Sequence, residues 1–513
     1  MRADASVHIG SGHVMRCLTL AQALTDAGLE VHFVCRAFPG NLIDSIRSRG
    51  FAVHSLPLRQ DSPPDTTPAH AGWLGVHWAV DARECLDVAG SLGPLRWILV
   101  DHYALDARWE AELAPASAKV AVIDDLTDRP HDCNLLLNQN LIRGASGRYT
   151  GLVPRDCRVL LGPAYALLRP EFREHRRRLS RDASRVGCAL VFLGGGDPGG
   201  TTLRLLELLE QVRPRTLLVR VVVSAANPYR VEIERRFGAQ PGYDVRVQAE
   251  NMAELMADAD VSVGAGGTAT WERCCVGLPT LLVALADNQV EVATMVAERG
   301  AGLFLGIASE ASDEVLTAGL RTLLHSGCLR KSLSDASLDL VDGDGCRRVA
   351  AEMLRPEVAV RPARSEDAPV VFPWRNAEAT RRFFHDPRPL TLAKHVSWFD
   401  TVLRDERRVL LIGEAAGRPV GVLRYDLDTG AADVSIYLDP AMRGRGIGRA
   451  LLLAGERWLC AHRPGSTLLR AEVRAANTAS RSAFAQAGFE VAGSLFEKRI
   501  ETASAGTACR RGT

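Results

Sequence analysis

Hydrophobic residues in the first two thirds of the chain follow two alternating patterns. Short apolar runs, each typical of a buried strand, are separated by segments in which apolar residues recur every three or four positions, as Val14, Leu18 and Ala21 do. Alternation of strand and helix predicts parallel sheets with helices on both faces. The predicted strands are 31–35, 97–100, 120–123, 188–193, 217–224, 260–264 and 279–285.

The charged segment 171–185 divides this alternation into two blocks, which we interpret as two doubly wound, Rossmann-like α/β domains at 1–170 and 186–355. A third block differs, because the predicted strands 407–414, 419–426 and 433–438 follow one another without helices between them. That order predicts a mixed sheet in an α+β domain at 358–500. Residues 501–513 are small, polar and without pattern, so we expect a disordered tail.

Composition and charge are those of an ordinary globular enzyme. The chain has 513 residues, enough for about three domains, with 47% hydrophobic and 24% charged residues. Lysine and arginine (62) balance aspartate and glutamate (61), so we expect neither nucleic acid nor a membrane as partner, and no obligate protein partner is inferred. There is no apolar run long enough for a membrane span and no signal-peptide pattern at the start.

The cysteines and histidines show no metal-binding pattern. The 12 cysteines are scattered and form no C-x-x-C pair, which favours reduced, buried thiols in a cytoplasmic protein. The H-E-x-x-H spacing of zinc sites and the loop spacing of calcium sites are also absent from the sequence. We therefore expect no metal.

Glycine-rich turns mark the first candidate site. The segment I-G-S-G-H, with Gly10, Gly12 and His13, precedes a predicted helix, where glycines let backbone amides approach a ligand closely. Two further turns, G-G-G-D at 194–197 and G-A-G-G-T at 264–268, follow predicted strands and suit a diphosphate. In the predicted helix after residues 264–268, Glu272 could accept hydrogen bonds from ribose hydroxyls. The residues proposed to bind UDP here are Gly195, Gly266, Gly267, Thr268 and Glu272.

These segments, with V-I-D-D-L, L-L-N-Q-N, Y-A-L-L-R-P-E-F and D-N-Q, resemble the PseG-type UDP-sugar hydrolases of pseudaminic acid biosynthesis over about residues 1–350. The resemblance implies a glycosyltransferase-B-like fold related to the MurG transferase. It also implies removal of UDP from a 2,4-diacetamido-2,4,6-trideoxy sugar by water attack at C1, with inversion and without metal. Because UDP leaves as a stable anion, one base for the water suffices.

The same resemblance assigns roles to individual residues. His13 matches the candidate base of the family, a role that suits an imidazole at neutral pH. Tyr103 and Asn288 match positions that orient sugar or water. Met1-Arg2-Ala3-Asp4 stands where the family has a longer first strand, so we expect either a late start codon or a shortened strand. Further substrate contacts are expected from Asp4, Asp101 and Gln289.

A second candidate site begins at R-G-R-G-I-G, residues 443–448, which follows a predicted strand and opens a predicted helix. Free amides at a glycine-rich helix start are a natural site for a pyrophosphate. Together with N-T-A-S-R-S-A-F-A-Q-A-G-F at 477–489, this segment resembles the GNAT acetyltransferases over about residues 358–500. The resemblance implies acetyl-CoA as co-substrate, held by Leu438, Arg443, Arg445, Gly446, Gly448 and Asn477.

Two further motifs resemble one particular branch of the GNAT acetyltransferases. W-R-N at 374–376 and H-x-x-W-F at 395–399 resemble the PseH branch, which acetylates the 4-amino group of the UDP-sugar that PseG-type hydrolases consume. Phe484 stands where many GNAT enzymes have a tyrosine that acts as general acid. The remaining candidates for proton transfer are Tyr437, Tyr425, Glu472 and His385.

The leading hypothesis is therefore a bifunctional enzyme that acetylates a UDP-4-amino-4,6-dideoxy sugar and hydrolyses the resulting UDP-2,4-diacetamido-2,4,6-trideoxy sugar. One alternative is a MurG-like UDP-sugar glycosyltransferase fused to an acetyltransferase. Another is a non-catalytic nucleotide-sugar sensor with a protein acetyltransferase module. The motifs do not encode the stereochemistry of the sugar, so altro and gluco isomers both fit them.

Overall fold

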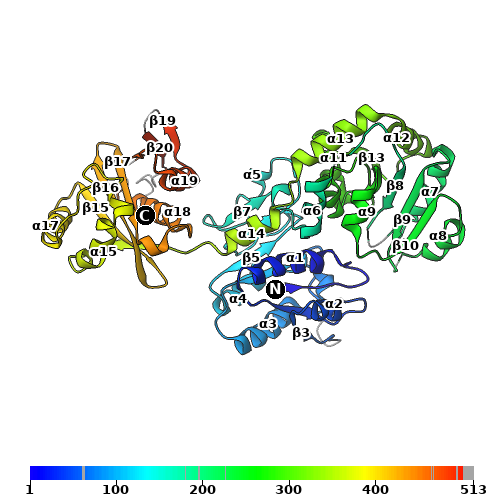
Figure 1. The fold of residues 1–513 in the computed structure, drawn as a ribbon. Helices are drawn as coiled ribbons and strands as arrows, with labels where there is room; N and C mark the ends of the chain where they lie inside the picture. The colour runs from blue at the N-terminus through cyan, green and yellow to red at the C-terminus, as the bar shows by residue number, and fades with distance from the viewer. Residues whose placement is uncertain are drawn as a thin grey trace, which may run out of the picture. The chain divides into compact units, whose positions relative to one another are not determined.

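The computed structural model describes residues 1–59, 64–179, 181–194, 197–225, 227–463, 465, 467–492 and 495–500 (Figure 1). The chain divides into two compact units, Met1–Met353 and a second unit that begins at Leu354. The predicted tail 501–513 and the predicted UDP contact Gly195 lie outside the described residues.

The first unit contains two parallel sheets, and the first of them runs in the order β3-β2-β1-β4-β5-β6-β7. The strand order reverses at β1 and β4, and doubly wound sheets bind ligands beyond the carboxyl ends of the strands at this point. The strands are β1 (Arg2–Ala3), β2 (His32–Arg36), β3 (Ala52–Leu56), β4 (Ile98–Asp101), β5 (Val120–Ile123), β6 (Leu135–Asn138) and β7 (Arg158–Leu161).

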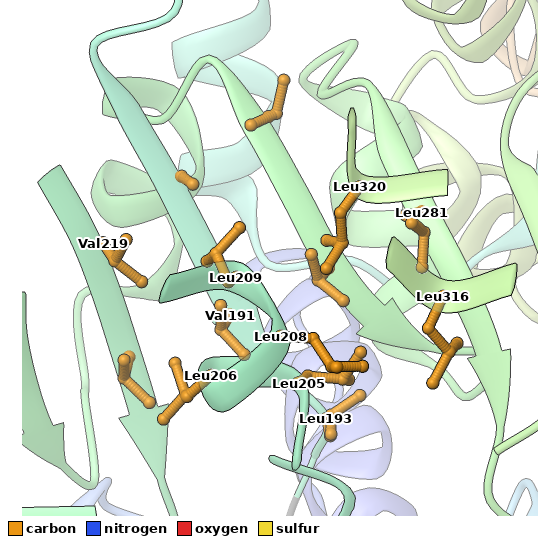
Figure 2. Close-up of a cluster of buried hydrophobic side chains, with 14 of the residues drawn as sticks. Val191, Leu193, Leu205, Leu206, Leu208, Leu209, Val219, Leu281, Leu316 and Leu320 are labelled. Carbon is orange, nitrogen blue, oxygen red and sulfur yellow. The ribbon is translucent and has the colours of Figure 1, made fainter. Parts of the chain in front are cut away.

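The second parallel sheet has the order β10-β9-β8-β11-β12-β13, which reverses between β8 and β11. Its strands read as continuous apolar runs because helices cover both faces. In Figure 2, Leu205 and Leu209 from a helix lie over Val191 and Val219 of neighbouring strands. The strands are β8 (Cys188–Phe192), β9 (Leu218–Val223), β10 (Tyr243–Val247), β11 (Val261–Ala265), β12 (Thr280–Ala284) and β13 (Leu303–Ile307).

Most helices of the first unit connect successive strands, and the last three follow its last strand. The last of them packs against the first helix, and the Cys346 thiol lies 3.4 Å from the Thr19 carbonyl oxygen. The helices are α1 (Gly12–Asp26), α2 (Ile43–Ser48), α3 (Trp78–Leu92), α4 (Ala107–Leu113), α5 (Ala145–Arg148), α6 (Pro170–Arg178), α7 (Thr201–Val212), α8 (Arg230–Phe237), α9 (Met252–Asp258), α10 (Ala269–Cys275), α11 (Val290–Glu298), α12 (Asp313–His325), α13 (Gly327–Leu340) and α14 (Gly345–Met353). Short 3₁₀ turns are η1 (Ala71–Leu74), η2 (Ala114–Ala116), η3 (Pro163–Tyr165) and η4 (Asp287–Gln289).

The second unit has one mixed sheet in the order β14-β15-β16-β17-β18-β20-β19. Only the β17–β18 pair is parallel among its described strands. Separate apolar clusters cover its two faces. The strands are β14 (Ala359–Pro362), β15 (Arg408–Ala415), β16 (Arg418–Asp428), β17 (Ala431–Leu438), β18 (Leu468–Glu472), β19 (Glu490–Ala492) and β20 (Leu495–Arg499). The helices are α15 (Asp367–Asn376), α16 (Glu378–Arg381), α17 (Leu392–Leu403), α18 (Ile447–His462) and α19 (Thr478–Gln486), with the 3₁₀ turn η5 (Pro440–Met442).

The predicted fold class is confirmed: two Rossmann-like parallel sheets are followed by a mixed α+β sheet. The predicted strand 120–123 coincides with β5, and the other predicted strands differ from the observed ones by a few residues at their ends. Within the parts of the chain that the structure covers, no helix is long and apolar enough to cross a membrane.

Candidate functional site

His13 lies in the first turn of α1 and faces the carboxyl end of β4. Its Nδ1 atom is 2.6 Å from Oδ1 of Asp101, the last residue of that strand. The side chain is 8% exposed, and its Nε2 atom has no hydrogen-bond partner among the described residues. A single ring nitrogen of this histidine is thus left to act on a ligand.

Arg16, one turn further along α1, holds the carboxylate of Asp101. Its Nε and Nη2 atoms donate to Oδ2 and Oδ1 of Asp101, both at 2.6 Å. Burial opposes ionisation of Asp101, but Arg16 and His13 outweigh it and hold the pKa of that carboxyl well below its usual range. Asp101 therefore stays a carboxylate and accepts the Nδ1 proton of His13, so Nε2 carries the lone pair that can accept a proton.

A second carboxylate extends this network to Tyr103. Asp125 Oδ2 accepts hydrogen bonds from Arg16 Nη1 and from the Tyr103 hydroxyl, both at 2.7 Å. The rings of Tyr103 and His13 meet edge to face with centroids 4.6 Å apart. The structure thus brings two of the predicted catalytic residues, His13 and Tyr103, together.

Asn140 connects this network to α10 beside the second sheet. Its Nδ2 donates to Asp125 Oδ1 at 2.8 Å, and its Oδ1 lies 3.3 Å from the indole nitrogen of Trp271. Trp271 directly precedes Glu272, one of the predicted UDP contacts. A continuous series of hydrogen bonds therefore runs from the His13 pair to the helix next to the predicted nucleotide site.

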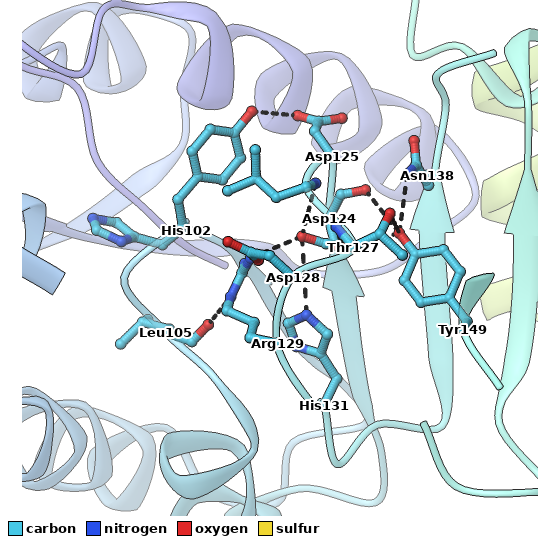
Figure 3. A network of polar contacts seen from close by, with 12 residues as sticks. His102, Leu105, Asp124, Asp125, Thr127, Asp128, Arg129, His131, Asn138 and Tyr149 are labelled. Carbon is cyan, nitrogen blue, oxygen red and sulfur yellow. Dashed lines mark hydrogen bonds and ion pairs between the residues drawn. The ribbon is translucent and has the colours of Figure 1, made fainter. Parts of the chain in front are cut away.

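The neighbouring carboxylate Asp124 anchors the segment that carries Asp125 (Figure 3). Arg129 Nη1 and the Tyr149 hydroxyl each donate to Asp124 at 2.9 Å. Burial acts against ionisation of Asp124, but Arg129 and His131 prevail and lower its pKa. Asp124 therefore belongs to a structural network, whereas Asp125 is bonded to Arg16 and Tyr103 of the candidate site.

Two aromatic residues beside Tyr103 were missed by sequence reasoning. The Trp73 ring stacks on Tyr103 at 5.6 Å, and the His70 ring lies 5.5 Å from Tyr103. Trp73 belongs to η1 and His70 directly precedes it, in a connecting segment that shows neither strand nor helix periodicity. No signal in the sequence distinguishes them from other loop residues.

The turn after β11 contains backbone amides that can bind an anion. The N–H groups of Gly267, Thr268 and Ala269 donate to no acceptor in the described part of the chain. Gly266 is required by packing, because a Cβ there would lie 2.9 Å from the Gln289 carbonyl oxygen. Because α10 has only seven residues, the partial positive charge that an anion would meet here comes from these free amides and not from the dipole of a long helix.

The same turn lies close to the first glycine segment. A Cβ placed on Gly12 would be 3.8 Å from Oγ1 of Thr268, so the start of α1 and the start of α10 are neighbours. Gln289 Oε1 accepts from the Leu285 amide at 3.0 Å and holds η4 beside the turn. The structure therefore groups His13, Gly12, Thr268 and Gln289 in one place.

The other predicted phosphate turn is arranged differently. Asp197 is buried, and its two carboxylate oxygens accept the amides of Thr201 and Thr202 at 2.8 and 2.7 Å. This carboxylate caps α7 and occupies the amides that a phosphate would need. The amides at the start of α7 are therefore occupied, whereas those of Gly267, Thr268 and Ala269 have no acceptor among the described residues.

Four other predicted site residues lie in different surroundings. Asp4 is fully buried and accepts hydrogen bonds from Arg2 of β1 and from the Arg36 amide of β2, so it holds these two strands together. Glu272 lies 3.9 Å from Arg169, and burial raises its pKa. Asn288 is exposed on η4, with no hydrogen bond among the residues described, and Gly10 has a positive φ of 79° at the turn before α1.

Arg273 is a buried cation that the sequence analysis did not single out. Its side chain is 1% exposed and lies against Gly264, where a Cβ would collide with it. Nη2 donates to the Ala265 carbonyl oxygen at 2.6 Å, while Nε and Nη1 have no partner among the described atoms. Burial lowers its pKa to about 10, so it remains positively charged behind the glycine turn at neutral pH.

A cavity in the first unit lies away from these groups. It is lined by residues at the amino ends of the central strands, including Met1, His32 and Ile98, and by the apolar side chains of Val88 and Trp109. His13 and Asp101 meet at the carboxyl end of β4 instead. Among the described residues, no group of three or more histidine, cysteine, aspartate or glutamate side chains is arranged to hold a metal.

The loop at 443–448 in the second unit has the features that a pyrophosphate requires. Gly444 and Gly446 have positive φ angles of 73° and 76°, and the amides of 444–448 donate to no acceptor among the residues placed by the structure. A Cβ on Gly448 would be 3.7 Å from the Leu438 side chain, so the loop lies against the end of β17. These free amides at the start of the 16-residue helix α18 fit an anionic cofactor arm.

The other predicted CoA contacts take part in local structure. Arg443 donates to the Thr380 hydroxyl, and Arg445 is exposed. Asn477 Oδ1 accepts from the Ser480 amide at 3.2 Å and caps α19, which leaves its Nδ2 available. Phe484 is 2% exposed and packs edge to face on Phe489, in an apolar cluster that has no place for an acid.

The comparisons with known proteins support both parts of the chain. Residues 357–490 match the acetyltransferase (GNAT) domain family. SpsG of Bacillus subtilis, a spore coat polysaccharide biosynthesis protein, is 33% identical over 202 residues, which are 39% of this chain and 59% of SpsG. The UDP-2,4-diacetamido-2,4,6-trideoxy-beta-L-altropyranose hydrolase of Campylobacter jejuni is 25% identical over 302 residues, 58% of this chain and 96% of the relative. The L-methionine sulfoximine/L-methionine sulfone acetyltransferase of Pseudomonas aeruginosa is 32% identical over 114 residues, 21% of this chain and 64% of the relative.

Among solved structures, MurG of Acinetobacter baumannii matches with a TM-score of 0.48 and 14% identity, covering 69% of this chain and 97% of MurG. The chain thus spans nearly the whole Campylobacter hydrolase but less than two thirds of SpsG and of the Pseudomonas acetyltransferase. The chain is thus similar to a UDP-sugar hydrolase and to SpsG, and its residues 357–490 match the GNAT acetyltransferase domain family.

Proposed function

We propose that the protein catalyses two reactions in the cytoplasm. The second unit transfers an acetyl group to the amine of a UDP-4-amino-4,6-dideoxy sugar. The first unit hydrolyses the resulting UDP-2,4-diacetamido-2,4,6-trideoxy sugar to free sugar and UDP. The similarity to the Campylobacter hydrolase and the GNAT match support this pairing, and the unpaired thiols of the described cysteines favour a cytoplasmic location.

The observation that carries the hydrolase proposal is the His13–Asp101 pair. Because Asp101 is ionised and accepts the Nδ1 proton, Nε2 of His13 takes a proton from water while the water oxygen attacks C1 of the sugar. The bond between C1 and the UDP oxygen breaks, and its electron pair leaves with UDP. A single displacement of this kind inverts the configuration at C1.

The free amides at Gly267, Thr268 and Ala269 supply the other requirement, which is stabilisation of the departing diphosphate. Arg273 lies behind this turn and adds positive charge without reaching the surface. Since UDP is a stable anion, no second carboxylic acid is needed to protonate it. The proposed roles of Tyr103, Asn288, Asp4, Gly10, Glu272 and Gln289 are to position the sugar, the water and the nucleotide.

The acetyl transfer is supported by the loop at 443–448. Its free amides, together with Leu438, Arg443, Arg445 and Asn477, are proposed to hold acetyl-CoA, which supplies an activated acetyl thioester. The substrate amine must lose a proton, and the thiolate that leaves must gain one. Phe484 cannot donate that proton, so Tyr437 is the better candidate, because its hydroxyl is buried and without a partner among the described residues.

The test is to incubate the full chain with the UDP-4-amino sugar and acetyl-CoA and to follow UDP, CoA and product mass together. The proposal predicts release of UDP and a free diacetamido sugar without any added acceptor. His13→Ala should stop UDP release but leave UDP binding and CoA release intact. UDP release that needs an added acceptor would instead support a glycosyltransferase, and an unchanged release rate in His13→Ala would contradict the role of His13.

A further inference from the structure

Polar groups without partners converge in the acetyltransferase unit, outside the CoA loop. The donors among them are Arg375 at the end of α15, Arg424 on β16 and Tyr437 on β17. Oδ1 of Asp426 on β16 and both ring nitrogens of His395 also lack a hydrogen bond among the described residues. Nη1 of Arg375, Nε of Arg424 and the hydroxyl of Tyr437 are buried and lack a hydrogen-bond partner among the described residues. Buried polar atoms are nearly always paired, so a cluster of unpaired ones indicates a missing ligand.

The three side chains are close neighbours. In the antiparallel β16–β17 pair, Arg424 is opposite Ser435, which puts Tyr437 on the same face two positions further along β17. The Arg375 guanidinium lies 3.6 Å from the centroid of the Phe384 ring, and that ring is 6.2 Å from Tyr437. Phe384 therefore forms an aromatic surface that fixes the plane of Arg375 beside the hydroxyl.

The charges in this cluster are not balanced. Arg375 forms no ion pair with a carboxylate in the described part of the chain, whereas Arg424 Nη2 is 2.8 Å from Asp426. Burial lowers the pKa of Arg375 from its ordinary value and Arg424 adds to this effect, while Tyr437 and the carboxylate of Asp386, which is paired with Arg388, act against it. Burial raises the pKa of Tyr437, so its hydroxyl stays protonated. Nη1 of Arg375 and Nε of Arg424 are hydrogen-bond donors of cations, and the one carboxylate paired in this cluster, Asp426, is bonded to Arg424 and not to Arg375, so Arg375 lacks an acceptor with negative charge.

The cluster also adjoins the place where acetyl transfer must occur. Tyr437 directly precedes Leu438, whose side chain lies against Gly448 of the CoA loop. Asn376, next to Arg375, bonds the backbone of Leu390 through both of its side-chain polar atoms, at 2.9 and 3.2 Å. This pair of bonds ties the segment after α15 in place and positions Arg375.

We propose that Arg375 and Arg424 form a subsite that binds an anionic group of the acetyl acceptor, with Arg375 as its main charge and with Tyr437, the proton donor proposed above, beside it. The proposal rests on the acetyltransferase function proposed above and specifies the chemical class of the acetyl acceptor. A planar guanidinium suits the paired oxygens of a phosphate or of a carboxylate. The two sources of that chemistry are the diphosphate of a nucleotide sugar and the carboxylate of an amino acid, and a polycationic amine is disfavoured.

The experiment measures CoA release by the full chain carrying His13→Ala, so that product hydrolysis does not interfere. The acceptors are the UDP-4-amino sugar, the same 4-amino sugar without UDP, L-methionine sulfone and spermine. For the UDP-sugar we expect Arg375→Ala to raise the KM for acceptor about 10- to 100-fold, with the KM for acetyl-CoA unchanged. The free amino sugar should be a poor acceptor whose kinetics do not depend on Arg375.

Control variants separate a binding role from a folding defect. Arg418→Ala removes an exposed arginine at the start of β16 and should leave both KM values unchanged. Arg375→Lys keeps the charge but not the paired donors, so its KM should fall between wild type and Arg375→Ala. Equal melting temperatures of these variants would exclude unfolding as the cause.

Each outcome decides the proposal. An Arg375-dependent KM for L-methionine sulfone, without transfer to the UDP-sugar, supports the anion subsite and assigns it to a carboxylate while contradicting the proposed sugar substrate. An acceptor KM that Arg375→Ala leaves unchanged, or a preference for spermine, overturns the subsite. Absence of transfer to every acceptor would contradict the proposed acetyltransferase function, and the subsite would fail with it.

Discussion

The two candidate sites hold their charged groups in opposite ways. Around His13, the carboxylates of Asp101 and Asp125 are both bonded to Arg16. In the second unit, the structure shows no partner among its described residues for the buried atoms of Arg375 and Tyr437. A base that acts on water must have its protonation state set before substrate arrives, whereas an anion subsite is neutralised by its ligand. The first site is thus organised by the protein itself, and the second requires its ligand to be complete.

The largest expected effect comes from breaking the organised site at Asp101. Asp101→Asn keeps the size of the side chain but removes the charge that holds the Nδ1 proton of His13, so Nε2 no longer carries a reliable lone pair. By analogy with the same change in serine proteases, kcat for UDP release should fall about 10³- to 10⁴-fold. Asp44→Asn, at a fully exposed carboxylate of α2, is the matched control and should have no effect. A loss below tenfold in Asp101→Asn would contradict the role of this pair.

Removing the arginine should change stability more than any surface ion pair does. Arg16→Gln leaves Asp101 and Asp125 buried without their cation, which should lower the free energy of unfolding at pH 7 by about 3–5 kcal/mol. Urea denaturation measures this change. Arg47→Gln, which breaks an exposed pair with Asp44, should change stability by less than about 1 kcal/mol.

The loss in free energy of unfolding caused by Arg16→Gln should become smaller as pH falls. The folded-state pKa of Asp101 is lowered, so its contribution to stability is present above the pKa of an unfolded aspartate and is lost as pH falls through the folded value. The difference between Arg16→Gln and wild type should therefore shrink below about pH 4. A difference that grows as pH falls would contradict this account of Asp101.

A smaller effect is expected at the glycine turn. Gly266→Ala places a Cβ 2.9 Å from a backbone oxygen of η4, so the turn or η4 must move and the free amides are displaced. We expect UDP to bind about tenfold more weakly, which is the loss of roughly one charge-assisted hydrogen bond. Calorimetric titration with UDP measures it. Gly90→Ala, in α3 with nothing within 4 Å, should bind UDP as the wild type does.

The smallest effect is expected at the contact between Asn140 and Trp271. Trp271→Phe removes the indole donor but keeps a ring, and kcat for UDP release should fall about two- to tenfold. If the hydrogen bond is responsible, Asn140→Ala should add little in a chain that already carries Trp271→Phe. Fully additive losses would show that the two residues act independently.

The elements of the fold follow from local patterns, and so the sequence predicted them well. The run 120–123 coincides with β5, and the glycine segment 264–268 begins in the last two residues of β11 and runs into the start of α10. The G-G-G-D turn shows the limit of such patterns, because Asp197 turned out to cap α7 with its own carboxylate. Whether the amides at the start of the following helix stay free depends on a side chain that the motif itself does not exclude.

The partners within the site could not be read from the sequence. Arg16 and Asp125 are 109 positions apart, and only the strand order of the first sheet brings them together. Likewise, Trp73 reaches Tyr103 from a connection without periodicity. The unpaired state of Arg375 is a property of its surroundings, and no residue type or spacing reports it.

The most direct test of the central claim is the position of oxygen from water after hydrolysis. If His13 directs water to C1, hydrolysis of the UDP-diacetamido sugar in ¹⁸O-labelled water should yield UDP without ¹⁸O, because the oxygen of the broken bond leaves with the phosphate. Mass spectrometry of the released UDP measures this in one reaction. One ¹⁸O atom in UDP would mean that water attacks phosphorus, and it would contradict the account.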